Sequence, residues 1–209
     1  RLGVFVDVQN MFYSAKYQYR SKLDFSKLLD HAVGGRDLVR AIAYLVQTPD
    51  IDQTNFIAML QSTGYEVRTK SLRLRPDGTA KGDWDMGIAL DTITLAARLD
   101  TIVLVTGDGD FVDLVSLLRA QGVRVEVLAF PYSTAEELKA SASEFRSIGP
   151  QLLLSSLPSN APIMPAPDAE MGGSAYQNSS SRREFVRSGA AENSYTAAAA
   201  QDRSGQEPG

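Results

Sequence analysis

Apolar residues follow two alternating patterns along residues 1–150 of this 209-residue chain. Short apolar runs, and one stretch in which polar and apolar residues alternate, predict strands over residues 2–8, 38–46, 65–74, 101–105 and 123–128. Segments with helical periodicity and helix-boundary residues predict helices over residues 10–19, 24–32, 52–62, 83–99, 108–120 and 134–143. This alternation predicts an α/β fold of the doubly wound, Rossmann-like type. It has a mostly parallel central sheet of about five strands with helices on both faces.

Two of the predicted helices carry an apolar stripe, the pattern of a helix face that packs against a core. The helix over residues 108–120 has its stripe at Phe111, Leu114, Val115 and Leu118. The helix over residues 83–99 has its stripe at Met86, Leu90, Ile93 and Ala97. We expect both stripes to face the sheet.

Residues 151–209 have a different composition. Pro, Ser, Ala, Gly, Asn and Gln dominate, with four prolines between Pro158 and Pro167, and the few large apolar residues show no period. Such a segment cannot bury enough apolar surface to offset the entropy lost on ordering. The sequence therefore predicts one domain over residues 1–150 and a low-complexity, disordered tail over residues 151–209.

Composition excludes several classes of site. The chain has no cysteine, which removes disulfides, thiolate metal sites and cysteine nucleophiles and fits a cytoplasmic protein. The single histidine, His31, stands near the end of a predicted helix, where a solvated position is the better interpretation than a catalytic one. No apolar run approaches the ~18 residues of a membrane span, so we expect no membrane partner.

Acidic residues stand at three junctions between predicted strands and helices. Asp7 ends the first strand, Asp108 and Asp110 follow the fourth strand, and Asp83 and Asp85 open the helix before it. In a doubly wound sheet, ligands bind beyond the carboxyl ends of the strands. Asp7 interrupts an apolar strand, where a lone carboxylate is costly unless it is paired or bound to a metal.

Each acid has a simpler interpretation. Asp108 or Asp110 alone could cap a helix, and Asp83 and Asp85 could complement a helix dipole. Three acidic junctions at one edge would, however, repel one another without a cation. Oxygen ligands select hard ions, so we expect Mg²⁺ or Mn²⁺. The candidate metal and catalytic residues are Asp7, Asp85, Asp108 and Asp110.

Glycine and asparagine lie beside these acids. Gly107 and Gly109 flank Asp108, where they allow a close approach of the backbone to a ligand or a turn with positive φ. Asn10 is one helical turn from Asp7 and could orient a water molecule or a phosphate. The alternative for Asn10 is local bonding to the backbone at a helix start.

The predicted RNA contacts come from a basic stretch. Arg68, Lys70, Arg73, Arg75 and Lys81 fall within fourteen residues, and together they could follow a nucleic-acid backbone. A solvated strand face is the alternative. The net charge of −4 and a pI near 5.1 count against nucleic-acid binding, although a carboxylate metal site contributes to that acidity. We assign RNA binding to Asn10, Arg73, Arg75 and Lys81.

Aromatic residues near these motifs have two interpretations. Phe12, Tyr13, Tyr17, Tyr19 and Trp84 could stack on bases, but aromatic residues at such spacing more often belong to a core or a helix surface.

Three sequence blocks together resemble the NYN-domain family, particularly its LabA-like bacterial branch. The blocks are VDVQN at residues 6–10, KGDWDMGIALD at residues 81–91 and TGDGDF at residues 106–111. The resemblance covers residues 1–150 and implies a PIN-like fold with a metal-dependent ribonuclease-type site. It carries a catalytic role onto Asp7, Asp85 and Asp108, with Asp110 as a fourth acid and Asn10 beside them. Thr106 replaces the serine usual in the family.

These observations predict a Mg²⁺- or Mn²⁺-dependent endoribonuclease. One alternative is an RNA-binding or regulatory module that keeps the acidic pocket but does not cleave. A second is a phosphatase for small phosphate esters, although the basic stretch favours a polymer. The sequence leaves the oligomeric state open, with a homodimer as one alternative.

Overall fold

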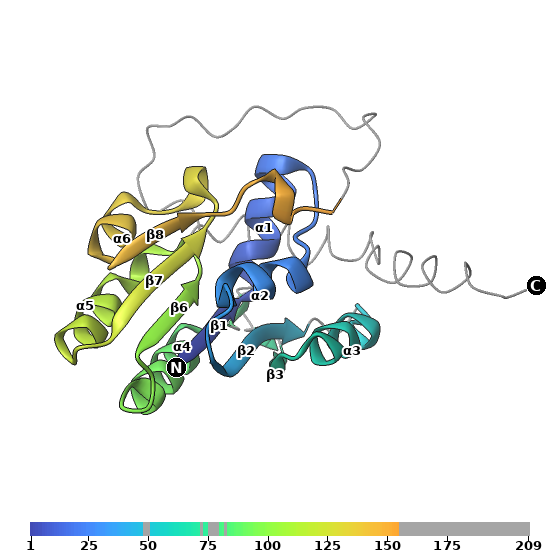
Figure 1. Ribbon diagram of the computed structural model, residues 1–209. Helices are drawn as coiled ribbons and strands as arrows, with labels where there is room; N and C mark the ends of the chain where they lie inside the picture. The colour runs from blue at the N-terminus through green and yellow to red at the C-terminus, as the bar shows by residue number, and fades with distance from the viewer. Residues whose placement is uncertain (48–50, 72, 75–79, 82, 155–209) are drawn as a thin grey trace, which may run out of the picture.

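The computed structural model describes residues 1–154 except 48–50, 72, 75–79 and 82 (Figure 1). The predicted disordered tail therefore lies outside the described residues from residue 155 onward, as does Arg75.

The centre of the fold is a sheet of six parallel strands in the order β3-β2-β1-β6-β7-β8. The strands are β1 (Leu2–Asp7), β2 (Leu38–Gln47), β3 (Glu66–Ser71), β6 (Thr101–Val105), β7 (Arg124–Ala129) and β8 (Glu144–Ser147). A separate antiparallel pair joins β4 (Arg73–Leu74) to β5 (Ala80–Lys81). The predicted α/β fold is confirmed, with a sixth strand. The sequence pattern missed β8 because its four residues, EFRS, carry two charges and no apolar run.

Helices cover both faces of this sheet (Figure 1). They are α1 (Val8–Tyr19), α2 (Phe25–Val33), α3 (Thr54–Thr63), α4 (Asp85–Ala96), α5 (Val112–Ala120) and α6 (Glu136–Ser141), with 3₁₀ turns η1 (Gly109–Phe111), η2 (Pro131–Ser133) and η3 (Pro150–Leu152). The strand order runs one way from β1 to β3 and the other way from β6 to β8. Right-handed crossovers therefore place α1, α2 and α3 on one face and α4, α5 and α6 on the other.

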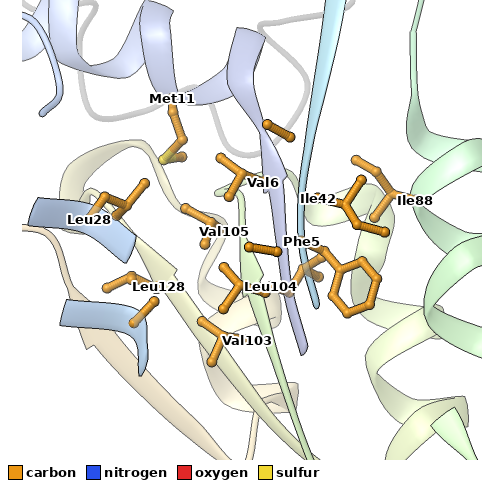
Figure 2. Packing of buried hydrophobic residues seen from close by; sticks show 14 of the residues in the cluster. Phe5, Val6, Met11, Leu28, Ile42, Ile88, Val103, Leu104, Val105 and Leu128 are labelled. Atoms are coloured by element: carbon orange, nitrogen blue, oxygen red, sulfur yellow. The ribbon is translucent and has the colours of Figure 1, made fainter. Parts of the chain in front are cut away.

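The core fills the space between the sheet and both helix layers. Figure 2 shows Val6 of β1 facing Met11 of α1, whereas Phe5 points the other way, toward Ile88 of α4. All four side chains are fully buried. Because strands β1 and β6 are covered on both faces, they read in the sequence as continuous apolar runs.

The predicted inner stripe of α4 is wrong. Met86, Leu90 and Ile93 are 69%, 59% and 38% exposed, and Ala97 is exposed too. The face that packs on the sheet instead carries Ile88, Thr92 and Ala96. The helix is apolar on nearly every side, so hydrophobicity alone could not select the buried face. The hydroxyl of Thr92 donates to the carbonyl of Ile88 at 2.8 Å, which satisfies it inside the core.

An ionic cluster ties α2 to the β7–β8 edge. Glu126 of β7 is buried, and its carboxylate accepts hydrogen bonds from Arg36 at 2.7 and 3.0 Å, from Arg124 at 3.1 Å and from Arg146 at 3.2 Å. Arg36 and Arg146 also donate to the carbonyl of Ala32 in the last turn of α2, at 2.6 and 3.3 Å. Cations at a helix C-terminus complement its dipole. By binding Arg36 and Arg146, the buried carboxylate of Glu126 holds two positive charges at the C-terminal end of α2.

Within the described residues, no helix has the length and apolar character needed to cross a membrane.

Candidate metal centre

The sheet brings two of the predicted acids to neighbouring positions. Asp7 is the last residue of β1, and Asp108 follows β6 by three residues. Strands β1 and β6 are paired, and the strand order changes direction between them. This is the topological switch point, where doubly wound folds bind their ligands.

Three carboxylates converge at this point. Asp85, the first residue of α4, Asp108 and Asp110 each offer an oxygen, and the three oxygens lie within 4.8 Å of one another. Two oxygen ligands of one Mg²⁺ are at most about 4.2 Å apart, because each bond is ~2.1 Å long. Small side-chain movements would therefore let all three bind one ion. The all-oxygen donor set fits a hard divalent cation.

Asp7 lies beside this triad without belonging to the group within 4.8 Å. Its Oδ1 accepts from the backbone N–H of Asn10 at 3.1 Å, and its Oδ2 lies 3.5 Å from the hydroxyl of Thr106. Burial is the largest cause that raises the pKa of Asp7 to about 7, and the carboxylates of Asp85 and Asp108 raise it further. A cation bound nearby would favour the charged form and release its proton.

Two of these acids are helix caps, Asp108 as the sequence allowed and Asp7 in addition. Asp7 caps α1, and Oδ1 of Asp108 accepts from the backbone N–H of Asp110 at 3.0 Å at the start of η1. Each cap uses one carboxylate oxygen, so the other oxygen of Asp108 can face a cation, whereas the other oxygen of Asp7 already accepts a long hydrogen bond from Thr106. Burial raises the pKa of Asp108, and the nearby carboxylate of Asp110 adds to this. Capping and metal binding are therefore compatible roles of the same side chain.

Asn10 holds the loop that carries Asp108. Its side-chain Oδ1 accepts from the backbone N–H of Gly107 at 2.9 Å. This contact joins the first turn of α1 to the end of β6, two chain segments that are far apart in sequence. Asn10 thus positions the acidic loop through its carbonyl oxygen, in addition to the RNA contact predicted for it.

Gly107 is required by a close approach of the chain to itself. Neither Gly107 nor Gly109 has a positive φ, contrary to one of the two explanations expected from the sequence. A Cβ on Gly107 would lie 2.7 Å from the carbonyl oxygen of Ser133 and 3.1 Å from Oγ1 of Thr134. The carbonyl of Gly107 also accepts from the N–H of Ala135 at 3.1 Å. Residues 131–135 support the acidic loop, a role that no local sequence signal revealed.

The comparisons with known proteins agree with this geometry. The family model described as the NYN domain matches residues 1–152. The chain belongs to the NYN-domain family. It is 31% identical over 153 residues to low amplitude and bright protein LabA from Synechococcus elongatus, covering 69% of this chain and 82% of that protein. A crystal structure of a protein of unknown function from Vibrio parahaemolyticus superimposes with a TM-score of 0.69 at 38% identity, covering 73% and 95% of the two chains. The resemblance predicted from the three sequence blocks is confirmed.

We expect Gly107→Ala to damage the acidic site of this NYN domain without removing any acid. The atom that the new Cβ would meet belongs to the backbone, so the loop carrying Asp108 must move. Overpacking of this kind costs about 1–3 kcal/mol in stability. If Mn²⁺ binds the acidic site as we expect, it should raise the melting temperature of the wild type, and in Gly107→Ala this rise should fall to near zero. Gly109→Ala is the control, because its Cβ would meet only the Cβ of Ala135, at 3.1 Å. An undiminished Mn²⁺ effect in Gly107→Ala would contradict this account.

Trp84 anchors the start of α4 in the NYN domain. Its indole Nε1 donates to the carbonyl of Leu45 at 3.0 Å, and its ring lies so close to Gly87 that a Cβ there would be 2.5 Å away. The ammonium of Lys70 lies 4.1 Å from the ring centroid. These contacts fix the residue before Asp85. They favour the packing interpretation of Trp84 over base stacking.

Part of the predicted basic stretch is engaged in ion pairs. Arg68 contacts Asp91 at 2.8 Å, and Asp91 also accepts from the hydroxyl of Tyr44 at 2.7 Å. Asp91 is therefore held in a salt bridge with Arg68 and does not join the converging acids. Arg68 has its charge offset, whereas Lys70 is exposed and donates to the backbone carbonyl of Asp83 at 3.1 Å.

The β4–β5 pair carries the other basic positions. Arg73 and Lys81 are directly opposite each other across the two strands, so the two positions are neighbours in space. Their side chains lie outside the described part of the structure, as does all of Arg75. The RNA-binding assignment of these three residues remains a prediction.

Proposed function

We propose that this NYN domain is a Mg²⁺- or Mn²⁺-dependent endoribonuclease. The observation that carries the proposal is the convergence of three carboxylate oxygens within 4.8 Å at the switch point of the sheet. Asp85, Asp108 and Asp110 would hold the ion, with Asp7 beside them. Membership of the NYN family supports RNA as the substrate.

The proposed chemistry uses carboxylates alone from the protein. When bound, a divalent ion would lower the pKa of a water molecule and stabilise charge on the phosphate. Burial raises the pKa of Asp7 to about 7, so this carboxylate can take up or release a proton near neutral pH, and the Asn10 and Thr106 contacts fix its orientation. His31 takes no part, because it lies in the last turn of α2, just before β2 begins. It is therefore near the amino ends of the strands, whereas the acids lie at their carboxyl ends.

The direct test is cleavage of a structured RNA pool by the purified protein. We expect new RNA fragments with Mn²⁺ and none after its removal by a chelator. RNA that is bound but stays intact under both conditions would support the non-cleaving RNA-binding module. Hydrolysis of a small phosphate ester without cleavage of RNA would instead support the phosphatase alternative.

RNA binding is proposed for Arg73, Arg75 and Lys81 around the β4–β5 pair, and for Asn10 at the start of α1. Replacing the three basic residues by glutamine should weaken RNA binding and lower the log–log slope of affinity against salt by about 0.7 for each phosphate that the protein no longer neutralises. Filter binding over a salt series measures this slope. The control is Arg119→Gln at the end of α5, near the amino ends of the strands, and it should leave the salt slope unchanged. A triple variant with the wild-type slope would move the RNA-binding surface elsewhere.

A further inference from the structure

The outward face of α4 is apolar and carries no charge along its length. Met86, Leu90, Ile93 and Ala97 are all exposed, and the other exposed residue between them is Thr94. Of the two acids within the helix, Asp85 belongs to the candidate metal centre and Asp91 turns inward to Tyr44 and Arg68. Soluble proteins rarely leave a continuous apolar surface of this kind without a partner.

The spacing of this stripe is that of a helix pair. Successive members are four, three and four residues apart, which is the a/d pattern of the narrow seam between two helices. The core-facing stripe of α4 lies on the other side, at Ile88, Thr92 and Ala96, so the exposed seam is additional to the one the fold uses. This pattern favours a helix as the occupant.

The stripe is complementary to itself in the antiparallel orientation. When two α4 helices pair about a two-fold axis between residues 91 and 92, Leu90 lies opposite Ile93 of the second copy. Met86 then lies opposite Ala97, so that a long side chain meets a short one. The two stripes therefore match along their whole length.

The charges at the ends of α4 also select this orientation. Asp83 is exposed at the N-terminal end of α4, and Arg98 is exposed just beyond its C-terminal end. No ion-pair partner of Arg98 is found among the described residues. An antiparallel pair brings Arg98 of each copy to the acidic end of the other helix. A parallel pair would place like charges together, which is unfavourable.

We propose that α4 is a self-association surface, through which two copies of this chain pair antiparallel about a two-fold axis. The seam ends at Met86, next to Asp85, so pairing brings Arg98 of the second copy beside each metal centre. A single helix pair lies at or below the low end of specific interfaces, about 1,200 Å². Leu117 on the adjacent α5 is also exposed and can extend the contact. We therefore expect weak association, with a dissociation constant in the micromolar range.

Sedimentation of the full chain tests the proposal. The apparent mass should rise from 22.7 kDa toward twice that value as the concentration increases from about 1 to about 200 µM. Leu90→Glu should stay monomeric throughout with an unchanged melting temperature, because Leu90 is exposed in the single copy. Tyr132→Glu is the matched control at another exposed site and should dimerise as the wild type does. A wild type that stays monomeric, or a Leu90→Glu variant that still dimerises, would overturn the proposal. If the wild type is monomeric and Leu90→Glu loses RNA binding, the stripe belongs to the RNA-binding surface instead.

The orientation has a separate test that exploits the absence of cysteine from the chain. The double variant Met86→Cys with Ala97→Cys should form a dimer linked by disulfides under mild oxidation. Met86→Cys alone should not, since its two thiols would be about 16 Å apart along an antiparallel pair, at 1.5 Å per residue. A crosslink in the single variant would show a parallel pair, and a double variant that stays uncrosslinked would also contradict the proposed geometry. Arg98→Asp should weaken the dimer, and adding Asp83→Arg should restore it.

Discussion

Asp108→Asn is expected to abolish the Mn²⁺ response of the protein while leaving the fold intact. A ligand that binds only the folded state at about a hundred times its dissociation constant stabilises it by about 2.7 kcal/mol. For a domain of this size, that corresponds to a rise in melting temperature of roughly 5–10 °C in the wild type. The variant should show none of this rise, since a hard dication prefers a charged oxygen. Any RNA cleavage should vanish with it.

The metal-free variant separates the two roles of Asp108. The oxygen that accepts from the N–H of Asp110 is retained in asparagine, so the cap at η1 should persist. Burial raises the pKa of Asp108, which means that the fold disfavours its charge. Asp108→Asn should thus be as stable as the wild type, or more so, before Mn²⁺ is added. Differential scanning calorimetry with and without Mn²⁺ measures both effects.

Asp113→Asn is the control for this experiment. Asp113 is exposed in the first turn of α5 and is not one of the three converging acids. It should keep the full Mn²⁺ response. A wild type without that response, or an Asp108→Asn variant that retains it, would reduce Asp108 to a helix cap. Loss of metal binding in a protein that never cleaved RNA would leave the RNA-binding module as the surviving function.

Glu126→Ala is expected to destabilise the fold by about 3 kcal/mol, the lower end of the range for breaking a buried ion pair. The side chain of Glu126 is only 4% exposed, and its removal leaves three arginines without their shared carboxylate. Partial access of these arginines to water places the cost at the lower end. The melting temperature should fall by roughly 6–12 °C. Thermal unfolding followed by circular dichroism at neutral pH measures this loss.

Glu144→Ala provides the matched control on the neighbouring strand. Glu144 also pairs with an arginine, Arg124, but its side chain is 47% exposed. Exposed pairs contribute about 0–1 kcal/mol, so this variant should melt close to the wild type. Equal losses in the two variants would contradict the special role of the buried carboxylate.

The effect of Glu126 should also depend on pH. Burial alone would raise the pKa of Glu126, but hydrogen bonds from Arg36 and Arg124 outweigh it and hold the pKa below the usual range of glutamate. The folded protein thus binds this proton less readily than the unfolded chain. The stabilisation is present above about pH 4.3 and is lost as pH falls through the lower pKa of the folded state. The difference between wild type and Glu126→Ala should therefore shrink in acid.

Much of the candidate site follows from local sequence. Asp7 could be recognised because a carboxylate ends an otherwise apolar strand, and Asp108 because it follows another such strand within TGDGDF. Parallel strands bring their carboxyl ends to one edge, so the two acids had to be close. Asp85 required one further step, the placement of the α4 start beside that edge. Asp91 follows Asp85 by six residues, about 240° further round a helix, so its side chain points away from the site and pairs with Arg68.

Two supporting contacts had no local signal. The close approach of residues 133–134 to Gly107 depends on how the chain returns after β7, more than twenty residues later. The buried Glu126 gathers Arg36, Arg124 and Arg146 from three separate segments. Each residue in these contacts looks ordinary within its own segment, and the contact exists because the sheet brings the segments together.

Strand and helix periodicity was sufficient for the α/β class, for five of the six strands of the central sheet, and for the edge at which the acids meet. Those features depend on short-range patterns and on general rules of parallel-sheet topology, which a single sequence carries. These patterns could not predict which face of α4 is buried, because apolar residues lie on nearly every side of the helix. Packing against Phe5 and Ile42 places Ile88, and not Met86, in the core. The four-residue strand β8 likewise forms because β7 offers a free edge to pair with, and its own residues give little preference.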